Sequence, residues 1–317
     1  MALISVCFFW GTTYLGIRMA LETVPPLALV SIRFLLSGSI LLAAAAWRGS
    51  LLPRGRDLRS ACISGALILG IGNGALVFAE LRIPSGLAGL FITISPFWMV
   101  GIEALLPGGE RLHWPTLFGM LVGLGGAALL LAPDLTGHSL GRNTLAGFLI
   151  LQLGMASWSF GSIFQKRQEM KAHPIVVGAI HQLAAGIAFT PLALLVPEHP
   201  IVWTTRGAGA VLYLVIFGSI VGYSAYAYAL DKLPVAVVSI YPYLNSMVAV
   251  TLGWLVYREP FGWREALAMA IIFTGVALVK RYAKKAPQSL PSTLAPIAPP
   301  AVQNTEIMMN QKSRKKR

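Results

Sequence analysis

Charged residues are scarce in this chain of 317 amino acids. Asp, Glu, Lys and Arg together make up 12% of it, against about 25% in soluble globular domains. Hydrophobic residues make up 56%, and the mean hydropathy is +0.70. So few charges cannot cover a water-exposed surface, which excludes an ordinary soluble enzyme. The high apolar content also excludes a chain that is disordered throughout.

Cysteine and the motifs of several enzyme classes are also scarce or missing. The two cysteines, Cys7 and Cys62, lie in or beside apolar segments, so the sequence predicts no disulfide framework. There is no Walker sequence, no His-Glu-x-x-His sequence and no Asp-rich motif, and no Asp lies inside an apolar segment. We therefore predict no catalytic residues, no ATP-driven pumping, no metal and no cofactor.

Long apolar segments are what the chain has in abundance. A helix needs about 20 residues to cross the hydrocarbon core of a bilayer. Ten segments are long enough: 2–20, 27–47, 60–79, 83–102, 112–133, 143–165, 172–197, 207–230, 233–257 and 261–280. The first has no basic residues before it, so we interpret it as a retained helix and not as a signal peptide. The sequence thus predicts an all-α integral membrane protein with ten transmembrane helices.

The basic residues fall mainly on one side of this predicted topology. The chain has 25 Lys and Arg against 12 Asp and Glu, a net charge of +13. With the N-terminus in the cytoplasm, 18 of the 25 basic residues lie on the cytoplasmic side. The excess is therefore an orientation signal, and nucleic acid is not needed to explain it. We predict a bacterial-type inner-membrane protein with both termini cytoplasmic.

The composition changes after the last apolar segment. Residues 286–317 are rich in Pro, Ser, Gln and Asn, and they end in the basic run from Lys312 to Arg317. We expect a disordered cytoplasmic tail whose basic end contacts anionic lipid.

The chain also repeats itself weakly at a spacing near 149 residues. The matching pairs are Trp10 with Trp158, Pro84 with Pro234, Glu110 with Glu259, and Trp114 with Trp263. Each unit, 1–133 and 144–282, holds five predicted helices, and because five is odd the second unit enters the membrane from the opposite side. Inverted repeats of this kind occur in secondary transporters, which bind substrate between the halves and work by alternating access.

The order of several short motifs resembles a known family. The motifs are Trp10-Gly11-Thr12, Pro25-Pro26, Arg33-Phe34, Pro84-Ser85-Gly86-Leu87-Ala88, Pro96, Gly109-Glu110-Arg111-Leu112, Pro234, Asn245, Gly253 and Glu259-Pro260. Over about residues 1–282 the chain resembles EamA-type transporters of the ten-helix drug/metabolite transporter superfamily. The resemblance implies export or exchange of small solutes such as amino acids. Two departures are Asn245-Ser246 where Pro96 leads one to expect a proline, and the lack of a second-half counterpart of Arg33.

Four ionisable residues stand out within or at the ends of the apolar segments: Arg33, Glu80, Glu103 and His181. Such residues are costly in a membrane and point to functional sites. Arg33 and Glu80 lie near the same outer end, where they can pair with each other or meet a zwitterionic substrate. Glu103 is expected at the inner interface. Histidine changes charge near neutral pH, so His181 suits a proton relay, although a hydrogen-bonded core histidine is the more common case.

Aromatic and amide side chains complete the predicted cavity. The candidate substrate-binding residues are Trp10, Thr12, Tyr14, Arg33, Asn73, Trp98, Trp158, His181, Tyr241 and Asn245. The alternative for the aromatic residues is interhelical packing or an interfacial belt. Gly-x-x-x-Gly motifs at Gly70, Gly119 and Gly218 favour close helix packing, with a homodimer contact as the alternative.

The sequence as a whole predicts a secondary transporter that moves small metabolites, amino acids or related compounds, in the direction of efflux. The alternatives are a membrane-embedded enzyme, for which His181 is the candidate group, and a membrane sensor or scaffold without transport.

Overall fold

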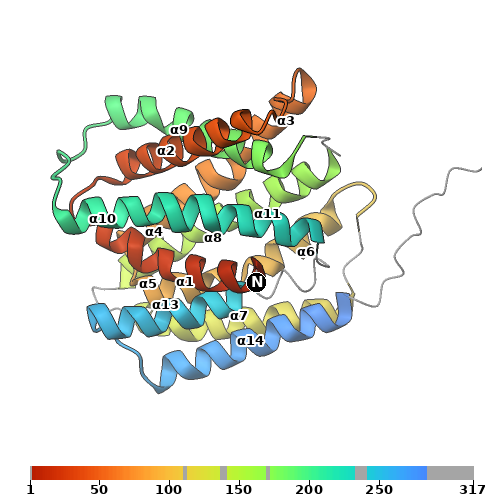
Figure 1. Cartoon of the computed structure of the whole chain (residues 1–317). Coiled ribbons are helices and arrows are strands. Elements are labelled where there is room, and N and C mark those ends of the chain that lie inside the picture. Colours follow the sequence, from red (N-terminus) through yellow and green to blue (C-terminus); the bar gives the residue numbers. More distant parts are fainter. Residues whose placement is uncertain (1, 110–112, 136–140, 169–171, 233–240, 284–317) are drawn as a thin grey trace, which may run out of the picture. The chain divides into compact units, whose positions relative to one another are not determined.

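The computed structural model describes residues 2–109, 113–135, 141–168, 172–232 and 241–283, and these ranges contain helices and turns but no strand (Figure 1). Seven helices run without interruption: α1 (Ala2–Leu21), α2 (Pro26–Trp47), α7 (Trp114–Leu135), α8 (Gly141–Arg167), α9 (Pro174–Leu195), α13 (Tyr241–Tyr257) and α14 (Trp263–Ala283). Glu110, Pro234 and the predicted tail 286–317 lie outside the described residues.

The helices confirm an all-helical, multi-pass membrane protein. Within the described ranges, seven helical stretches are long and apolar enough to cross a membrane, and Trp114–Leu130 is a shorter apolar helix. Large apolar side chains such as Leu105, Leu194 and Leu195 are at least 79% exposed, as expected for a surface that faces lipid. Each of the ten predicted segments contains a helix. That all ten cross the membrane stays a prediction.

The fourth predicted segment is broken in its middle. Helix α5 (Ser85–Ile92) ends before Thr93, and α6 (Ser95–Leu105) begins with Pro96 in its first turn. Proline has no backbone N–H to donate to the preceding turn, and its ring clashes with the carbonyl four residues earlier. Pro96 therefore accounts for the break between α5 and α6.

Two further helices contain a π-helical run at matching positions. One is built from α3 (Arg56–Gly65), η1 (Ala66–Asn73) and α4 (Gly74–Glu80), and the other from α10 (Thr205–Tyr213), η2 (Leu214–Val221) and α11 (Gly222–Lys232). Both runs contain 8 residues, and η2 begins 148 residues after η1. π-Helical turns are rare and often mark functional sites.

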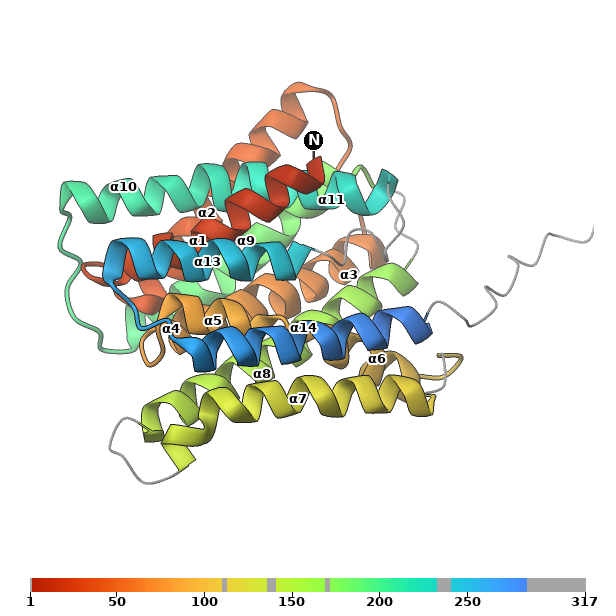
Figure 2. The same cartoon turned by 90° about the horizontal axis from the view of Figure 1, so that it is seen from below.

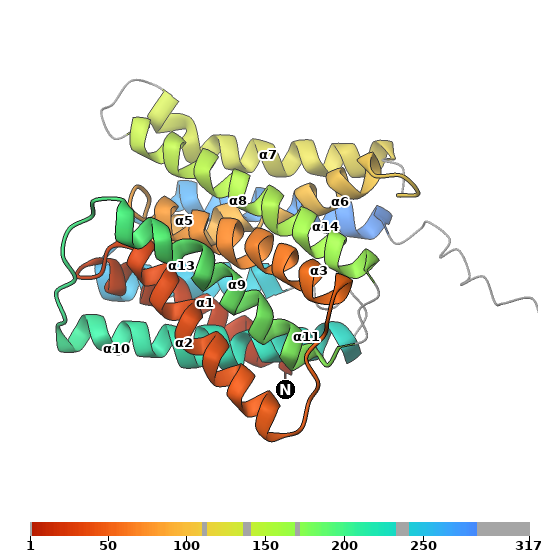
Figure 3. The same ribbon diagram turned by 90° about the horizontal axis from the view of Figure 1, so that it is seen from above.

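The helices pack in pairs that join distant parts of the chain. Helix α2 lies along α9 (Figure 3), and α7 lies along α14 (Figure 2). Helix α1 contacts α10, η2 and α11, whereas α8 contacts α3, η1 and α4. The π-helical runs are thus packed against α1 and α8.

Glycines allow the closest of these approaches. A Cβ atom on Gly275 of α14 would lie 2.4 Å from the backbone nitrogen of Gly123 and 2.6 Å from the carbonyl oxygen of Gly119, both on α7. The Gly119-x-x-x-Gly123 motif therefore packs against a helix of its own chain, which supports the packing interpretation of this motif.

Candidate functional site

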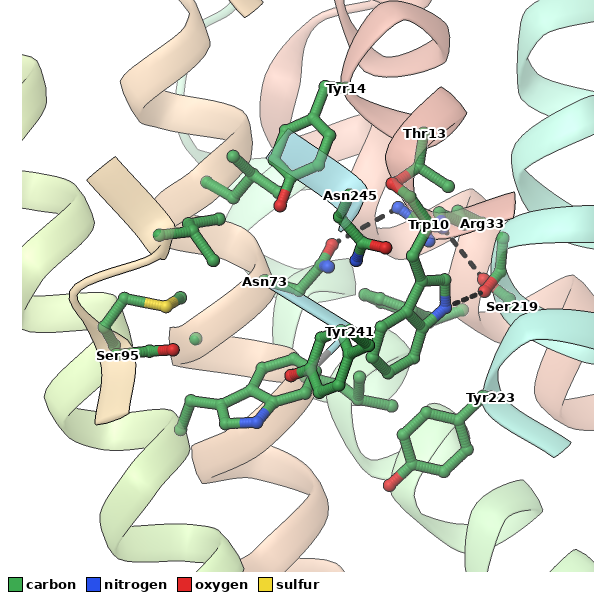
Figure 4. Close-up of a pocket in the computed structure, with 18 of the residues that line it drawn as sticks. Trp10, Thr13, Tyr14, Arg33, Asn73, Ser95, Ser219, Tyr223, Tyr241 and Asn245 are labelled. Carbon is green, nitrogen blue, oxygen red and sulfur yellow. Dashed lines mark hydrogen bonds between the residues drawn. The ribbon is translucent and has the colours of Figure 1, made fainter. Parts of the chain in front are cut away.

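A cavity lies among the helices, and eight of the ten predicted segments contribute to its wall (Figure 4). It is lined by Trp10, Thr13, Tyr14, Arg33, Phe34, Leu69, Gly72, Asn73, Leu76, Ile92, Ser95, Met155, Trp158, Gln182, Gly218, Ser219, Tyr223, Tyr241 and Asn245. The space open to the centre of a water molecule is about 60 Å³. Since one water needs roughly 10–15 Å³ on this measure, the cavity has room for more than one water molecule.

Arg33 is the one charged side chain in this wall among the described residues. It lies on α2 and is 4% exposed. Its Nε donates a hydrogen bond to Ser219 Oγ at 2.8 Å, and one terminal nitrogen donates to Asn73 Oδ1 at 3.3 Å (Figure 4). Both partners are neutral, and each belongs to one of the π-helical runs. Within the described part of the chain, no carboxylate lies within ion-pair distance of Arg33.

Trp10 stands at the centre of an aromatic group beside Arg33. Its ring centroid lies 5.9 Å from that of Trp158, 5.2 Å from that of Tyr241 and 5.0 Å from that of Tyr226. The indole Nε1 donates to the carbonyl oxygen of Gly218 at 2.9 Å. This bond fixes the ring at η2, so the indole has a defined orientation in the cavity wall.

Backbone groups hold the side chain of Asn245, which also lines the cavity. Its side chain is 1% exposed. In the amide orientation that satisfies both of its ends, the nitrogen donates to the carbonyl oxygens of Cys7, at 2.7 Å, and Tyr241, at 3.0 Å. The Asn245 side chain therefore connects α1 with α13.

Seven of the ten predicted site residues lie in this wall: Trp10, Tyr14, Arg33, Asn73, Trp158, Tyr241 and Asn245. The other three, Thr12, Trp98 and His181, do not line it. The Thr12 hydroxyl donates to the carbonyl oxygen of Phe9 at 2.7 Å and hydrogen-bonds the hydroxyl of Tyr213. It is the neighbouring Thr13 that reaches the cavity.

Trp98 and His181 have structural partners instead. The Trp98 indole donates to Gln152 Oε1 at 2.8 Å, and the Gln152 amide donates to the carbonyl oxygen of Phe91 at 3.5 Å, close to the break between α5 and α6. His181 is fully buried, and its Nδ1 hydrogen-bonds the hydroxyl of Tyr223 at 2.7 Å. Tyr223 lines the cavity, so His181 lies directly behind its wall.

The remaining ionisable residues differ in their environments. Glu103 is 37% exposed and pairs with Arg167 at 3.0 Å, an exposed position consistent with an interface. Glu80 is 5% exposed, and neither of its carboxylate oxygens has a hydrogen-bond partner. The pair between Arg33 and Glu80 that the sequence allowed is not formed.

Several cavity residues were not among the sequence candidates, notably Thr13, Ser95, Gln182, Ser219 and Tyr223. Tyr223 carried a signal, because it shares a helix face with Tyr226 three residues on. No pattern in the sequence pointed to Ser219, because it reaches Arg33 only through the packing of η2 against α2. Among the described residues, no group of three or more His, Cys, Asp or Glu side chains could hold a metal ion.

Membrane-crossing helices around a buried cavity that contains one charged group define a multi-pass membrane protein of the transporter class. Comparison with known proteins agrees with this class. The model of the EamA-like transporter family matches residues 1–132 and 145–281. The chain belongs to this family.

Relatives carry transporter names. The chain is 35% identical over 281 residues to the "Uncharacterized inner membrane transporter YedA" of Escherichia coli K12. The aligned stretch covers 88% of this chain and 89% of that protein. It is 26% identical over 281 residues to the "Probable terminal-alkyne amino-acid exporter" of Streptantibioticus cattleyicolor, covering 88% and 92% of the two chains. The family and these names indicate a membrane transporter and not an enzyme.

A solved structure, described only as "Crystal structure of protein", has the same fold. It matches with a TM-score of 0.64 at 24% sequence identity, over 89% of this chain and 96% of that one.

Proposed function

We propose that this protein is a secondary transporter that exports amino acids or related small metabolites by alternating access between two inverted five-helix repeats. The observation that carries the proposal is Arg33, a buried cation with neutral partners in a cavity otherwise built from aromatic, aliphatic, amide and hydroxyl groups. A buried charge is costly unless it is compensated, which makes this position a site for an anionic group of the substrate.

The cavity has complementary groups for both parts of an amino acid. A guanidinium group has five N–H donors in a planar arrangement that fits a carboxylate. Ser219 and Asn73 occupy only part of this capacity and hold the group in place. The rings around Trp10 offer an apolar surface for the rest of a small amphipathic molecule.

Three observations support the inverted repeat. The family model matches two successive stretches, 1–132 and 145–281. The π-helical runs η1 and η2 have equal lengths and a spacing of 148 residues. The packing of α1 along α10, η2 and α11 corresponds to the packing of α8 along α3, η1 and α4. Repeats related in this way can rock against each other around a central site.

The proposed direction rests on the relative whose name describes an amino-acid exporter. The proposed orientation, with both termini in the cytoplasm, rests on the 18 basic residues that this topology places inside.

Counterflow in proteoliposomes tests the transport function. Purified protein is reconstituted into vesicles loaded with unlabelled proteinogenic amino acids, and a radiolabelled mixture of the same amino acids is added outside. We expect saturable uptake of label, with the recovered label chemically unchanged. Sealed vesicles with no flux for these amino acids or for a broad metabolite pool would contradict a transporter, and chemically altered label would indicate a membrane-embedded enzyme.

A further inference from the structure

Glu80 is a buried acidic side chain for which neither the cavity nor the packing supplies a partner. It is the last residue of α4, one turn after Leu76, which lines the cavity. The residue is 5% exposed, and both carboxylate oxygens are buried without a hydrogen-bond donor among the residues that the structure describes. By contrast Glu259, which is 8% exposed, accepts hydrogen bonds from Ser85 and Gly86.

The charged and titratable groups around Glu80 come from three places. Among the described residues, four groups interact electrostatically with the Glu80 carboxyl group. Tyr14 and Arg18 lie on α1, Arg33 lies on α2, and Glu259 lies in the connection between α13 and α14. The neighbouring helix α5 carries no charged residue, and the charged side chains that the structure describes on α8, Lys166 and Arg167, lie in its last turn. None of these groups hydrogen-bonds Glu80, because Arg18 pairs with Glu259 at 3.5 Å and Arg33 donates to Ser219 and Asn73.

Ion pairs and hydrogen bonds join several helix ends at the membrane end where Glu80 lies. Arg18 of α1 pairs with Glu259, which in turn accepts from the backbone nitrogens of Ser85 and Gly86 at 2.9 Å each. Glu22 at the end of α1 pairs with Arg206 of α10 at 3.2 Å. These contacts tie together the ends of four helices, and both oxygens of the Glu80 carboxyl group are buried in this conformation.

An ionised carboxylate without a donor in such an enclosed site is strongly disfavoured, and a carboxyl group in that position takes up a proton instead. From this geometry we propose that Glu80 is the proton-binding site of the transport cycle. The proposal rests on the function proposed above. When no substrate is bound, closure of the end that the predicted topology places outside requires a protonated Glu80, so the empty protein returns to the cytoplasmic side carrying a proton.

The proton balance of this step is simple. When the outer end opens, the Arg18–Glu259 pair separates and water reaches the Glu80 carboxylate. A hydronium ion from outside transfers its proton to a carboxylate oxygen, an O–H bond forms, and a water molecule is left. After the outer end closes and the inner side opens, cytoplasmic water enters the cavity beside Leu76, the O–H bond of Glu80 breaks, and the proton leaves to that water. Each substrate molecule exported is thereby exchanged for one imported proton.

Infrared spectroscopy tests the proton site without any knowledge of the substrate. In reconstituted protein at neutral pH we expect a protonated-carboxyl stretching band that disappears in Glu80→Gln. The matched control is Glu103→Gln, which makes the same change at a carboxylate that is half-exposed and already paired with Arg167. Absence of the band in the wild-type protein, or its persistence in Glu80→Gln, would overturn the proposal.

Proteoliposomes that contain a pH-sensitive dye test the coupling. Using the labelled amino-acid mixture, we expect wild-type export to be accompanied by proton entry and to slow as the external pH is raised. Glu80→Gln resembles the protonated group, so it is expected to keep counterflow at all pH values but to lose proton movement. Glu80→Asp keeps a titratable carboxyl group and is expected to retain coupling.

The remaining outcomes separate the two proposals. Counterflow without proton movement in the wild-type protein, or a requirement for sodium, would overturn proton coupling and leave the transport function standing. A folded Glu80→Gln protein that loses counterflow would also overturn it, since the side chain would then bind substrate or support the fold. If the wild-type protein showed no counterflow, the transport function and the coupling would both fail, while the infrared band would still decide whether Glu80 holds a proton.

Discussion

Arg33 shows how a single residue depends on helices far away in the chain. The cost of a cation within an apolar segment makes it conspicuous in the sequence. Its partners Ser219 and Asn73 are ordinary polar residues, and they become important because η2 and η1 bring them to α2. The charge in the cavity is thus held in place by neutral hydrogen bonds, which leave it available to an anionic ligand.

Replacement of Arg33 by alanine is expected to abolish saturable transport while leaving folded protein in the membrane. A hydrogen bond to a charged group contributes about 1.5–3 kcal/mol, which corresponds to roughly a 10- to 150-fold loss of apparent substrate affinity, so that transport no longer saturates in the concentration range of the wild-type protein. Counterflow with concentration series measures this loss. Arg167→Ala removes an arginine from an exposed pair with Glu103 and is the matched control, with unchanged flux expected. An Arg33→Ala protein with wild-type affinity would remove this residue from the site.

Seven of the lining residues were predictable from the sequence, but the side of each helix that faces the cavity was not. Thr12 and Thr13 are adjacent on α1, and only Thr13 lines the cavity. In a soluble helix the polar face reveals which side is buried. In a membrane both the lipid-facing side and the inner side are apolar, so this signal is lost. The same ambiguity placed Trp98 in the site, although it bonds to Gln152.

At the scale of helices, the contact between α7 and α14 depends on the absence of side chains. A Cβ atom on Gly119 would lie 2.7 Å from the carbonyl oxygen of Gly275 and 2.9 Å from the backbone nitrogen of Val279. Both are backbone atoms that cannot move without shifting the helix. A Cβ atom on Gly125 of the same helix would meet nothing within 4 Å.

Gly119→Ala is therefore expected to destabilise the protein by about 1–3 kcal/mol, the usual cost of overpacking. Gly125→Ala makes the same chemical change without a clash and is expected to be neutral or to stabilise by up to about 1 kcal/mol, because alanine is the better helix former. Thermal unfolding of the two variants in detergent measures the difference. Equal melting temperatures would contradict the close approach of α7 and α14.

Helix positions were predictable from apolar length, but their internal irregularities were only partly so. The break near Pro96 follows from the missing N–H of proline. The π-helical runs η1 and η2 follow from no residue type, because a wider helical turn needs only a different hydrogen-bond pattern. The structure was needed to find them, and with them the residues that hold Arg33.

At the scale of the whole chain, the cavity belongs to neither half alone. Arg33 and Asn73 come from the first stretch matched by the family model, and Ser219 and Asn245 come from the second. The repeat in the sequence predicted two halves, but pairs of identical residues at a fixed spacing cannot say which helices meet. The packing of α1 on η2 and of α8 on η1 supplies that information.

The proposed orientation has a direct test in cells. Alkaline phosphatase fused after Arg317 is expected to be inactive, and green fluorescent protein at the same position is expected to fluoresce, because the basic residues keep this end in the cytoplasm. A phosphatase fusion after His199, in the connection between α9 and α10, is the control and is expected to be active. The opposite pattern at both positions would reverse the topology.

The matching π-helical runs also bear on the history of the chain. A π-helical turn arises when a helix accommodates an extra residue, an event with no reason to recur independently at the same register. Runs of equal length at Ala66–Asn73 and Leu214–Val221 are what duplication of one ancestral gene segment would leave, if that segment already contained the run. In that history the irregular turn is older than the asymmetry of the present chain, and Arg33, which has no counterpart in the second half, marks where the two copies diverged.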